Sequence, residues 1–206
     1  MKKYMNNKII AGLGVLTLTA CQQNTDDLII EDFESGTYAD WTVEGDAFGT
    51  TPATGGYTGQ QPVTGFEGKH LTNSFNNGDD SRGALTSKEF TIERDYINFL
   101  VGGGTHADTY IELLVEGKSV LQSRSLYESE TLQWLTWDVK PYKGKKATIR
   151  IVDNQRGGWG HILIDQIEQG NKQKSVFMTD YTRTFEAKDK YLLIPVEDQA
   201  TENKVQ

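Results

Sequence analysis

Short apolar segments separated by turn residues run along the chain from residue 28 to residue 170. Leu132–Val139 and Ala147–Asp153 alternate apolar and polar positions, which is the period of a strand with one buried face. Tyr96–Val101 is mostly apolar and stops at three consecutive glycines, as a buried strand does. The same region shows no convincing helical repeat of apolar residues. The pattern therefore predicts an all-β domain.

About ten short strands are expected, with turn residues at close spacing. They are predicted at Leu28–Phe33, Trp41–Glu44, His70–Phe75, Gly83–Ile92, Tyr96–Val101, Tyr110–Val115, Val120–Ser125, Leu132–Val139, Ala147–Asp153 and His161–Ile167. The range Asp46–Gly68 is rich in glycine, threonine and proline and is expected to form long loops. This set predicts an antiparallel jelly-roll β-sandwich of the galactose-binding-like type over residues 28–170. A closed barrel is the alternative.

The N-terminal segment has the character of an export signal. Three lysines precede the apolar run Ile9–Ala20, which is shorter than the roughly 20 residues needed to cross a bilayer. We interpret residues 1–20 as a secretory signal peptide. Leu18-Thr19-Ala20-Cys21 resembles the lipobox of bacterial lipoproteins, so Cys21 is predicted to carry lipid and to begin the mature chain. An ordinary signal peptide followed by an unrelated cysteine is the alternative.

A lipid on Cys21 would hold the protein at the cell envelope, on the outer membrane or on a surface or periplasmic face. Residues 21–27 are then a polar tether, and Asp26 and Asp27 resemble the acidic export signals of surface lipoproteins in gut bacteria. Cys21 is the single cysteine, so no disulfide is expected. Stability must come from packing, and a bound cation is a further candidate.

The charge balance narrows the class of partner. Removing the three lysines of residues 1–20 from the net charge of −8 leaves a formal charge of −11. An acidic surface repels nucleic acid and anionic lipid, whereas a neutral polysaccharide is not repelled. We therefore expect no nucleic-acid partner.

Several spaced motifs resemble the N-terminal accessory domain of family 32 glycoside hydrolases, the levanase and fructan β-fructosidase type, from gut bacteria. They are Phe33–Tyr38 with Trp41, Glu44–Gly49, Phe90–Leu100, Gly102–Gly104 and Gly157–Asp165. In addition, Tyr191–Val196 resembles the segment that leads into the catalytic five-bladed propeller of these enzymes. The resemblance thus implies that residues 171–206 are a linker and a first strand leading toward a catalytic domain.

The catalytic motifs of family 32 are not found in this sequence. Those enzymes use aspartates in Trp-Met-Asn-Asp-Pro-Asn-Gly and Arg-Asp-Pro motifs and a glutamate beside a cysteine. This chain has no Asn-Asp-Pro, and Arg94-Asp95 is followed by tyrosine rather than proline. The resemblance therefore implies a non-catalytic region, which binds fructan (levan or inulin) or braces the propeller. The alternatives are a purely structural lipoprotein module without a sugar ligand and an unrecognised enzyme with a carboxylate pair in a cleft.

Candidate ligand-binding residues cluster around the glycine-rich stretch before the last strand. Trp159 lies among three glycines that can expose its ring as a platform for a sugar, although a core-capping tryptophan has the same pattern. His161 is a candidate donor to a sugar hydroxyl, or else a core-edge histidine bonded to backbone. The preceding loop adds Asp153, Asn154 and Arg156, and His106 follows the triple glycine. Turn chemistry and a solvated loop are the alternatives for these four.

A structural calcium site is the one metal candidate. Glu34 follows the first predicted strand and Asp165 lies on the last, and in many sandwiches of this kind two such acids meet. Because Ca²⁺ takes six to eight oxygen ligands, backbone carbonyls would have to supply the rest. The alternative is two acids that bond backbone amides. Asp79 and Asp80 lack further acids nearby and are expected to form only a turn.

Overall fold

The computed structural model describes residues 27–175. The predicted signal peptide, the lipidation site Cys21, most of the predicted tether and the strand expected at Tyr191–Val196 lie outside these residues. Within residues 27–175, no helix has the length and apolar character needed to span a bilayer.

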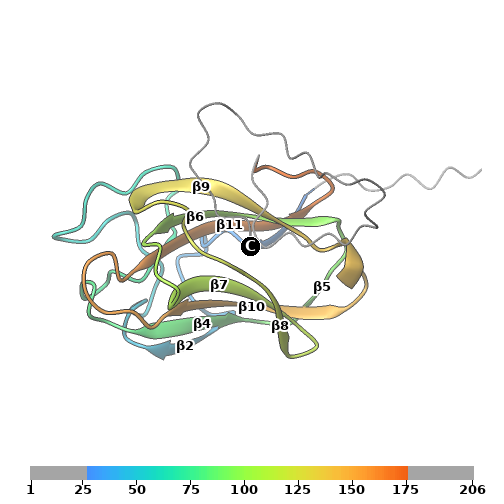
Figure 1. Ribbon diagram of the computed structural model, residues 1–206, viewed down its shortest axis with the longest axis horizontal. Helices are drawn as coiled ribbons and strands as arrows, with labels where there is room; N and C mark the ends of the chain where they lie inside the picture. The colour runs from blue at the N-terminus through green and yellow to red at the C-terminus, as the bar shows by residue number, and fades with distance from the viewer. Residues whose placement is uncertain (1–26, 176–206) are drawn as a thin grey trace, which may run out of the picture.

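Two antiparallel sheets pack face to face (Figure 1). The first sheet has the strand order β1 (Leu28–Glu31), β11 (Ile162–Gly170), β6 (Tyr96–Gly103) and β9 (Ser129–Asp138), with β3 (Thr72–Asn73) also paired to β11. The second has the order β2 (Trp41–Gly45), β4 (Gly83–Ser87), β10 (Lys146–Asp153), β7 (Thr109–Val115) and β8 (Lys118–Ser123), with β5 (Phe90–Thr91) paired to β10. The predicted jelly-roll β-sandwich is confirmed. The alternative of one closed barrel is wrong, because the strands form two separate open sheets.

The alternating pattern of the sequence gives the core its inward-facing residues. In β9, Leu135 and Trp137 are buried between the sheets, whereas Trp134 points to the opposite face, as predicted. Trp137 is fully buried against Phe99, and its indole N–H donates to the Ser123 hydroxyl at 2.8 Å. A buried indole nitrogen needs such an acceptor, because an unpaired polar atom in the core is costly.

Two predicted strands are shorter than expected. Gly83–Ile92 is divided into β4 and β5, and His70–Phe75 contains only the two-residue β3. Neither segment keeps a strict alternation of apolar and polar residues, so pairing with β10 and with β11 decides how far each strand extends.

The long irregular segment between β2 and β3 covers the outer face of the first sheet. Leu71 and Ala53 from this segment pack with Leu100, Leu132 and Leu163 of the sheet in a second, smaller apolar cluster. Thr64 also forms an isolated bridge with Thr131 at the edge of the sheet. The loops predicted at 46–68 are thus held against the sandwich, and they carry polar side chains to one end of it.

The polar residues 171–175 are also fixed to the outer face of the first sheet. The Lys174 N–H donates to Asn98 Oδ1, and the Ser175 N–H donates to Thr136 Oγ1, both at 3.1 Å. The Lys174 ammonium lies 2.6 Å from the buried carboxylate of Glu168 and 4.2 Å from the centre of the Trp134 ring. The last described residues therefore follow a defined path over the sheet.

Candidate functional site

The glycine-rich stretch before β11 forms a tight loop at one end of the sandwich. Gly157 and Trp159 both have left-handed backbone conformations, with φ of 87° and 61°. The loop packs directly on the end of β6, where a Cβ on Gly104 would lie 1.8 Å from the Trp159 carbonyl oxygen. The glycines at the end of β6 therefore allow this loop to approach closely, and the loop presents Trp159.

His161 lies below Trp159 between two carboxylates. Its Nδ1 is 2.6 Å from Asp79 Oδ1, and its Nε2 is 3.1 Å from Glu130 Oε1. The imidazole is buried, with Trp159 stacked on one side at a centroid distance of 5.7 Å and Phe75 edge-on at 5.0 Å. Burial alone would lower the pKa of His161, but the hydrogen bonds to Glu130 and Asp79 outweigh it and raise the pKa.

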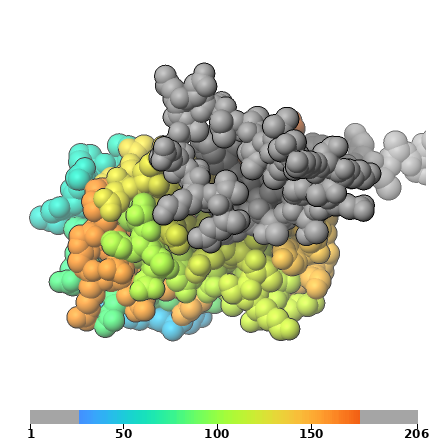
Figure 2. Space-filling model, in the orientation of Figure 1, coloured from blue at the N-terminus to red at the C-terminus, as the bar shows by residue number. Residues whose placement is uncertain are grey.

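A chain of side-chain hydrogen bonds extends from this group to the long loop. The Gln60 amide donates to Glu130 Oε2 at 2.9 Å, and Asn73 donates to the Gln60 carbonyl oxygen at 2.9 Å. Asp79 accepts a further bond at 3.2 Å from the Trp159 N–H. Figure 2 shows the loop after β10, in orange, beside the blue-green segment that precedes β4. The three chain segments are therefore held together by polar contacts.

A cleft of about 190 Å³ opens over this network. Its lining combines aromatic rings, carboxylates and amides: Gly59, Gln60, Gln61, Phe75, Asp79, Glu130, Gly158, Trp159 and His161. We refer to it as the rim cleft. Such a mixture provides both donors and acceptors beside an apolar ring face, which is the usual composition of a site for a small polar ligand.

Asp153 lies behind the rim cleft rather than in it. Its side chain is almost fully buried, and one carboxylate oxygen has no hydrogen-bond partner among the described residues. Burial raises the pKa of Asp153 to about 7, although hydrogen bonds from Ser74 and Gln155 and the nearby His161 oppose the rise. Asp153 is therefore not placed to touch a ligand in the rim cleft.

The other predicted ligand-binding residues divide between two surfaces. Trp159 and His161 lie together as described, and His106 joins their loop, with its Nε2 3.2 Å from the Gly158 carbonyl oxygen. Arg156 is exposed in the same loop. Asn154 instead lines a separate groove on the outer face of the second sheet.

Two expectations about this region need correction. The alternative in which His161 bonds to backbone is wrong, because its ring nitrogens face carboxylates. Asp79 lies in a turn as expected, yet its carboxylate also contacts His161 and the Trp159 N–H. Sequence reasoning missed Glu130, Gln60 and Asp79 as members of the site, because no local spacing relates them to residues 157–161.

The two predicted calcium ligands both accept hydrogen bonds from the backbone of one short segment, residues 67–70. Glu34 Oε1 accepts from the N–H groups of Lys69 and His70 at 2.8 and 2.7 Å, and Asp165 Oδ2 accepts from the Glu67 N–H at 2.8 Å. These backbone hydrogen bonds lower the pKa of Glu34. Asp165 is fully buried, its other oxygen has no hydrogen-bond partner among the described residues, and burial raises its pKa to about 7.

Two side chains alone make an incomplete metal site. Within residues 27–175, no group of three or more His, Cys, Asp and Glu side chains is arranged to hold a metal ion. A Ca²⁺ ion would therefore depend on backbone carbonyls for most of its ligands. The Asp165 oxygen that has no hydrogen-bond partner among the described residues is suited to be one of the side-chain ligands. Calcium binding by Glu34 and Asp165 stays a prediction.

Comparison with known proteins links part of the chain to a named protein. No family model matches the chain. A stretch of 146 residues is 47% identical to a protein of Aspergillus rugulosus named "Putative glycosyl hydrolase ecdE". The match covers 69% of this chain but only 21% of that protein, so the chain spans about a fifth of the relative's length.

Similar solved structures include sugar-binding modules and an adhesin domain. TmCBM61 in complex with β-1,4-galactotriose is 18% identical, with a TM-score of 0.42 over 66% of this chain and 91% of that one. The K3 adhesin domain of Lys-gingipain from Porphyromonas gingivalis is 18% identical, with a TM-score of 0.44 over 69% and 96%. CBM51 from Clostridium perfringens, in complex with methyl-galactose, is 14% identical, with a TM-score of 0.36 over 70% and 99%.

Proposed function

We propose that this chain is a non-catalytic accessory region of a glycoside hydrolase and that its rim cleft binds a neutral polysaccharide. The observation that carries the proposal is the row of Asp79, His161 and Glu130 beneath the half-buried ring of Trp159. Its support from comparison is the 47% identity to one part of a much longer protein named as a glycosyl hydrolase.

The chemistry of the rim cleft suits a sugar. Carboxylate and amide groups accept and donate hydrogen bonds to hydroxyls, and an indole ring packs against the apolar face of a pyranose or furanose ring. His161 lies between two acids, so the positive charge that its raised pKa favours is more than offset within the site and the cleft does not attract anions. A neutral ligand therefore meets directed hydrogen-bonding groups.

In its finer form the proposal names a fructan (levan or inulin) as the polymer and glycoside hydrolase family 32 as the enzyme class. It also places the protein in the cell envelope, anchored through lipid on Cys21, with the catalytic propeller following. The sequence motifs that resemble family 32 accessory domains support this form. Metabolic labelling with an alkyne-tagged fatty acid tests the anchor, because only the parent and not Cys21→Ala should become labelled.

A bracing role is the second candidate. The observation that favours it is the fixed path of residues 171–175, which Asn98, Thr136 and Glu168 hold to the first sheet. A pinned exit would orient whatever follows it more firmly than a flexible linker does. Bracing needs no ligand, so a binding assay separates the two roles.

The binding assay is a native gel of the whole chain with levan, inulin or an unrelated glucan cast in the matrix. We expect one fructan to retard the protein and Trp159→Ala to weaken that retardation strongly, because the variant removes the ring over His161. Tyr127→Ala is the matched control, since Tyr127 is an exposed aromatic residue away from the rim cleft. Retardation by none of the polymers would overturn binding and leave bracing, whereas retardation by the glucan alone would overturn the fructan assignment.

A further inference from the structure

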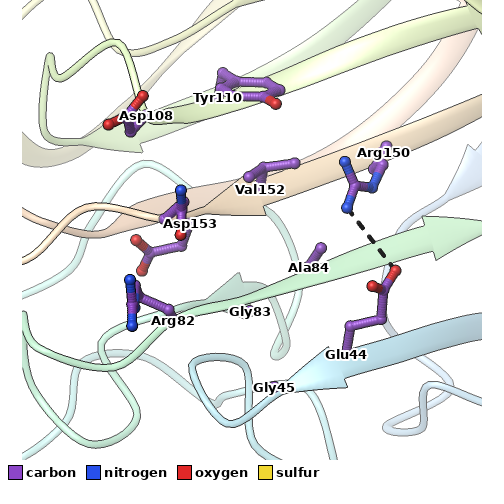
Figure 3. A pocket seen from close by; sticks show the side chains of 11 residues that line it. Glu44, Gly45, Arg82, Gly83, Ala84, Asp108, Tyr110, Arg150, Val152 and Asp153 are labelled. Atoms are coloured by element: carbon purple, nitrogen blue, oxygen red, sulfur yellow. Dashed lines mark ion pairs between the residues drawn. The ribbon is translucent and has the colours of Figure 1, made fainter.

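A second hollow, larger than the rim cleft, lies on the outer face of the second sheet (Figure 3). It has a volume of about 550 Å³, within the range of ligand-binding sites in proteins. Strands β2, β4, β7 and β10 all contribute to its lining. We refer to it as the sheet groove.

The sheet groove runs across the strands because of the register between them. Glu44 pairs with Ala84, Ala84 with Val152, and Val152 with Tyr110, so these four residues form one row on the outer face. Ala84 and Val152 are small and apolar and make a low floor in the middle of the row. Longer side chains, Glu44 and Tyr110, stand at its two ends, as Figure 3 shows.

One side of the sheet groove is walled by an arginine between two acids. The Arg150 guanidinium lies 3.9 Å from Glu44 and 3.7 Å from Glu112, so acids on two strands flank it. These distances are longer than those of hydrogen bonds, so the N–H donors of the guanidinium remain for a ligand. Arg150 can therefore present donors at this wall of the groove.

The opposite wall comes from the ends of the strands. Arg82, Asp108 and Asn154 line it, and all three are exposed. The Asn154 N–H donates to the Asp108 carbonyl oxygen at 2.9 Å, which ties the two loops that carry these side chains. This wall thus supplies a cation, a carboxylate and an amide at fixed backbone positions.

The charges of the two walls indicate a neutral ligand. Arg82 and Arg150 meet the acids Glu44 and Asp108, and the lining also includes Asp153, whose pKa burial raises to about 7, so the sheet groove has no excess of positive charge. Burial raises the pKa of Tyr110, so its hydroxyl stays protonated and can donate as well as accept. Alternating donors and acceptors around an apolar floor suit a chain of sugar rings, which carries hydroxyls on its edges and C–H groups on its faces.

We propose that the sheet groove is a second carbohydrate-binding site, which takes a neutral oligosaccharide across strands β2, β4, β10 and β7. The choice of ligand class rests on the function proposed for the rim cleft. Asp79 of the rim cleft and Arg82 of the sheet groove lie only three residues apart in one short segment, so the two sites are neighbours. One polymer that occupies both sites binds more tightly than either site alone, because the second contact is intramolecular.

Titration calorimetry of the whole chain tests the second site. The three probes are a short oligosaccharide from levan, a short oligosaccharide from inulin, and β-1,4-galactotriose. We expect a stoichiometry of two oligosaccharides per parent chain. It should fall to one in Arg82→Ala or Tyr110→Ala, which remove opposite parts of the sheet groove, and to one in Trp159→Ala. Arg124→Ala and Tyr127→Ala, exposed residues outside both sites, should retain two. Affinity for the intact polymer should fall at least about tenfold in each single-site variant.

The outcomes separate the two proposals. Binding of one oligosaccharide that Trp159→Ala abolishes and Arg82→Ala leaves unchanged would overturn the sheet groove and uphold the rim cleft. Binding that only the Arg82 and Tyr110 variants abolish would uphold the sheet groove and overturn the rim cleft. No binding of any of the three probes by the parent would overturn both. Arg82 is exposed, so its variant provides a result even if Tyr110→Ala fails to fold.

Discussion

Asp165 is a fully buried acid in β11, and its replacement by asparagine tests how much an unpaired carboxylate costs the fold. Burial raises its pKa to about 7, hydrogen bonds from the N–H groups of Glu67 and Gln166 oppose the rise, and the charge of Glu34 adds to it. The ordinary value is 3.8. Between these two values the unfolded chain releases a proton that the folded chain keeps, so the free energy of unfolding falls as the pH rises from about 4 to about 7.

The size of the loss follows from the two pKa values. A difference of about three units, at roughly 1.4 kcal/mol per unit, means that Asp165 alone contributes about 4 kcal/mol less to the stability of the fold above pH 7 than near pH 4. The asparagine side chain of the Asp165→Asn variant carries no charge at any pH and can still accept the Glu67 N–H. Its amide must find an acceptor where the carboxylate oxygen has no partner, so we expect the variant to gain about 2–4 kcal/mol at pH 8 and little at pH 4.

Urea denaturation monitored by tryptophan fluorescence, at several pH values from 4 to 8 with a chelator present, measures this difference. The stabilities of parent and Asp165→Asn should separate progressively with rising pH. Asp108→Asn, an exposed acid in the same sandwich, is the control and should follow the parent. Parallel curves for parent and Asp165→Asn would refute the reasoning, because they would mean that the folded and unfolded chains ionise Asp165 alike.

Three further predictions test the metal site, the site geometry and the core. Added Ca²⁺ should raise the melting temperature of the parent at pH 8 by several degrees and that of Glu34→Gln much less, as a thermal scan would show. Gly104→Ala should weaken polysaccharide binding at least about tenfold and destabilise the fold by about 2 kcal/mol, because its Cβ would collide with the Trp159 carbonyl oxygen. Trp137→Phe should cost about 2–3 kcal/mol in urea denaturation, since it leaves a void in the core and removes the hydrogen bond to Ser123.

Each of these has a result that contradicts it. A Ca²⁺-induced rise of equal size in Glu34→Gln would place the ion elsewhere. Unchanged binding by Gly104→Ala would show that the loop can move without loss of the site. A stability of Trp137→Phe within about 0.5 kcal/mol of the parent would mean that the core repacks around the smaller ring.

The sequence predicted most of the strands because their pattern is local. In β9 and β10 the alternation of apolar and polar residues assigns each side chain to a face, and the structure follows it. The division of Gly83–Ile92 into β4 and β5 could not be foreseen as reliably, since pairing with β10 decides where that strand ends. Register depends on partners that are distant in the sequence.

The candidate site was predictable only in part. Trp159 and His161 were found because they lie beside glycines in one short segment. Asp79 and Glu130 precede His161 by 82 and 31 residues, and the separation between Gln60 and Glu130 is 70 residues. Nothing in their immediate neighbours marks them as partners.

The sequence alone determined the class of fold, the inward face of each clear strand and the glycine-rich loop that carries Trp159, because these depend on the properties of adjacent residues. The tertiary structure decided which acids face His161 and where the sheet groove lies. The cross-strand row from Glu44 to Tyr110 exists only once four strands are paired in register. Long-range pairing brings these residues together because burial of both sheets in one core fixes their relative positions.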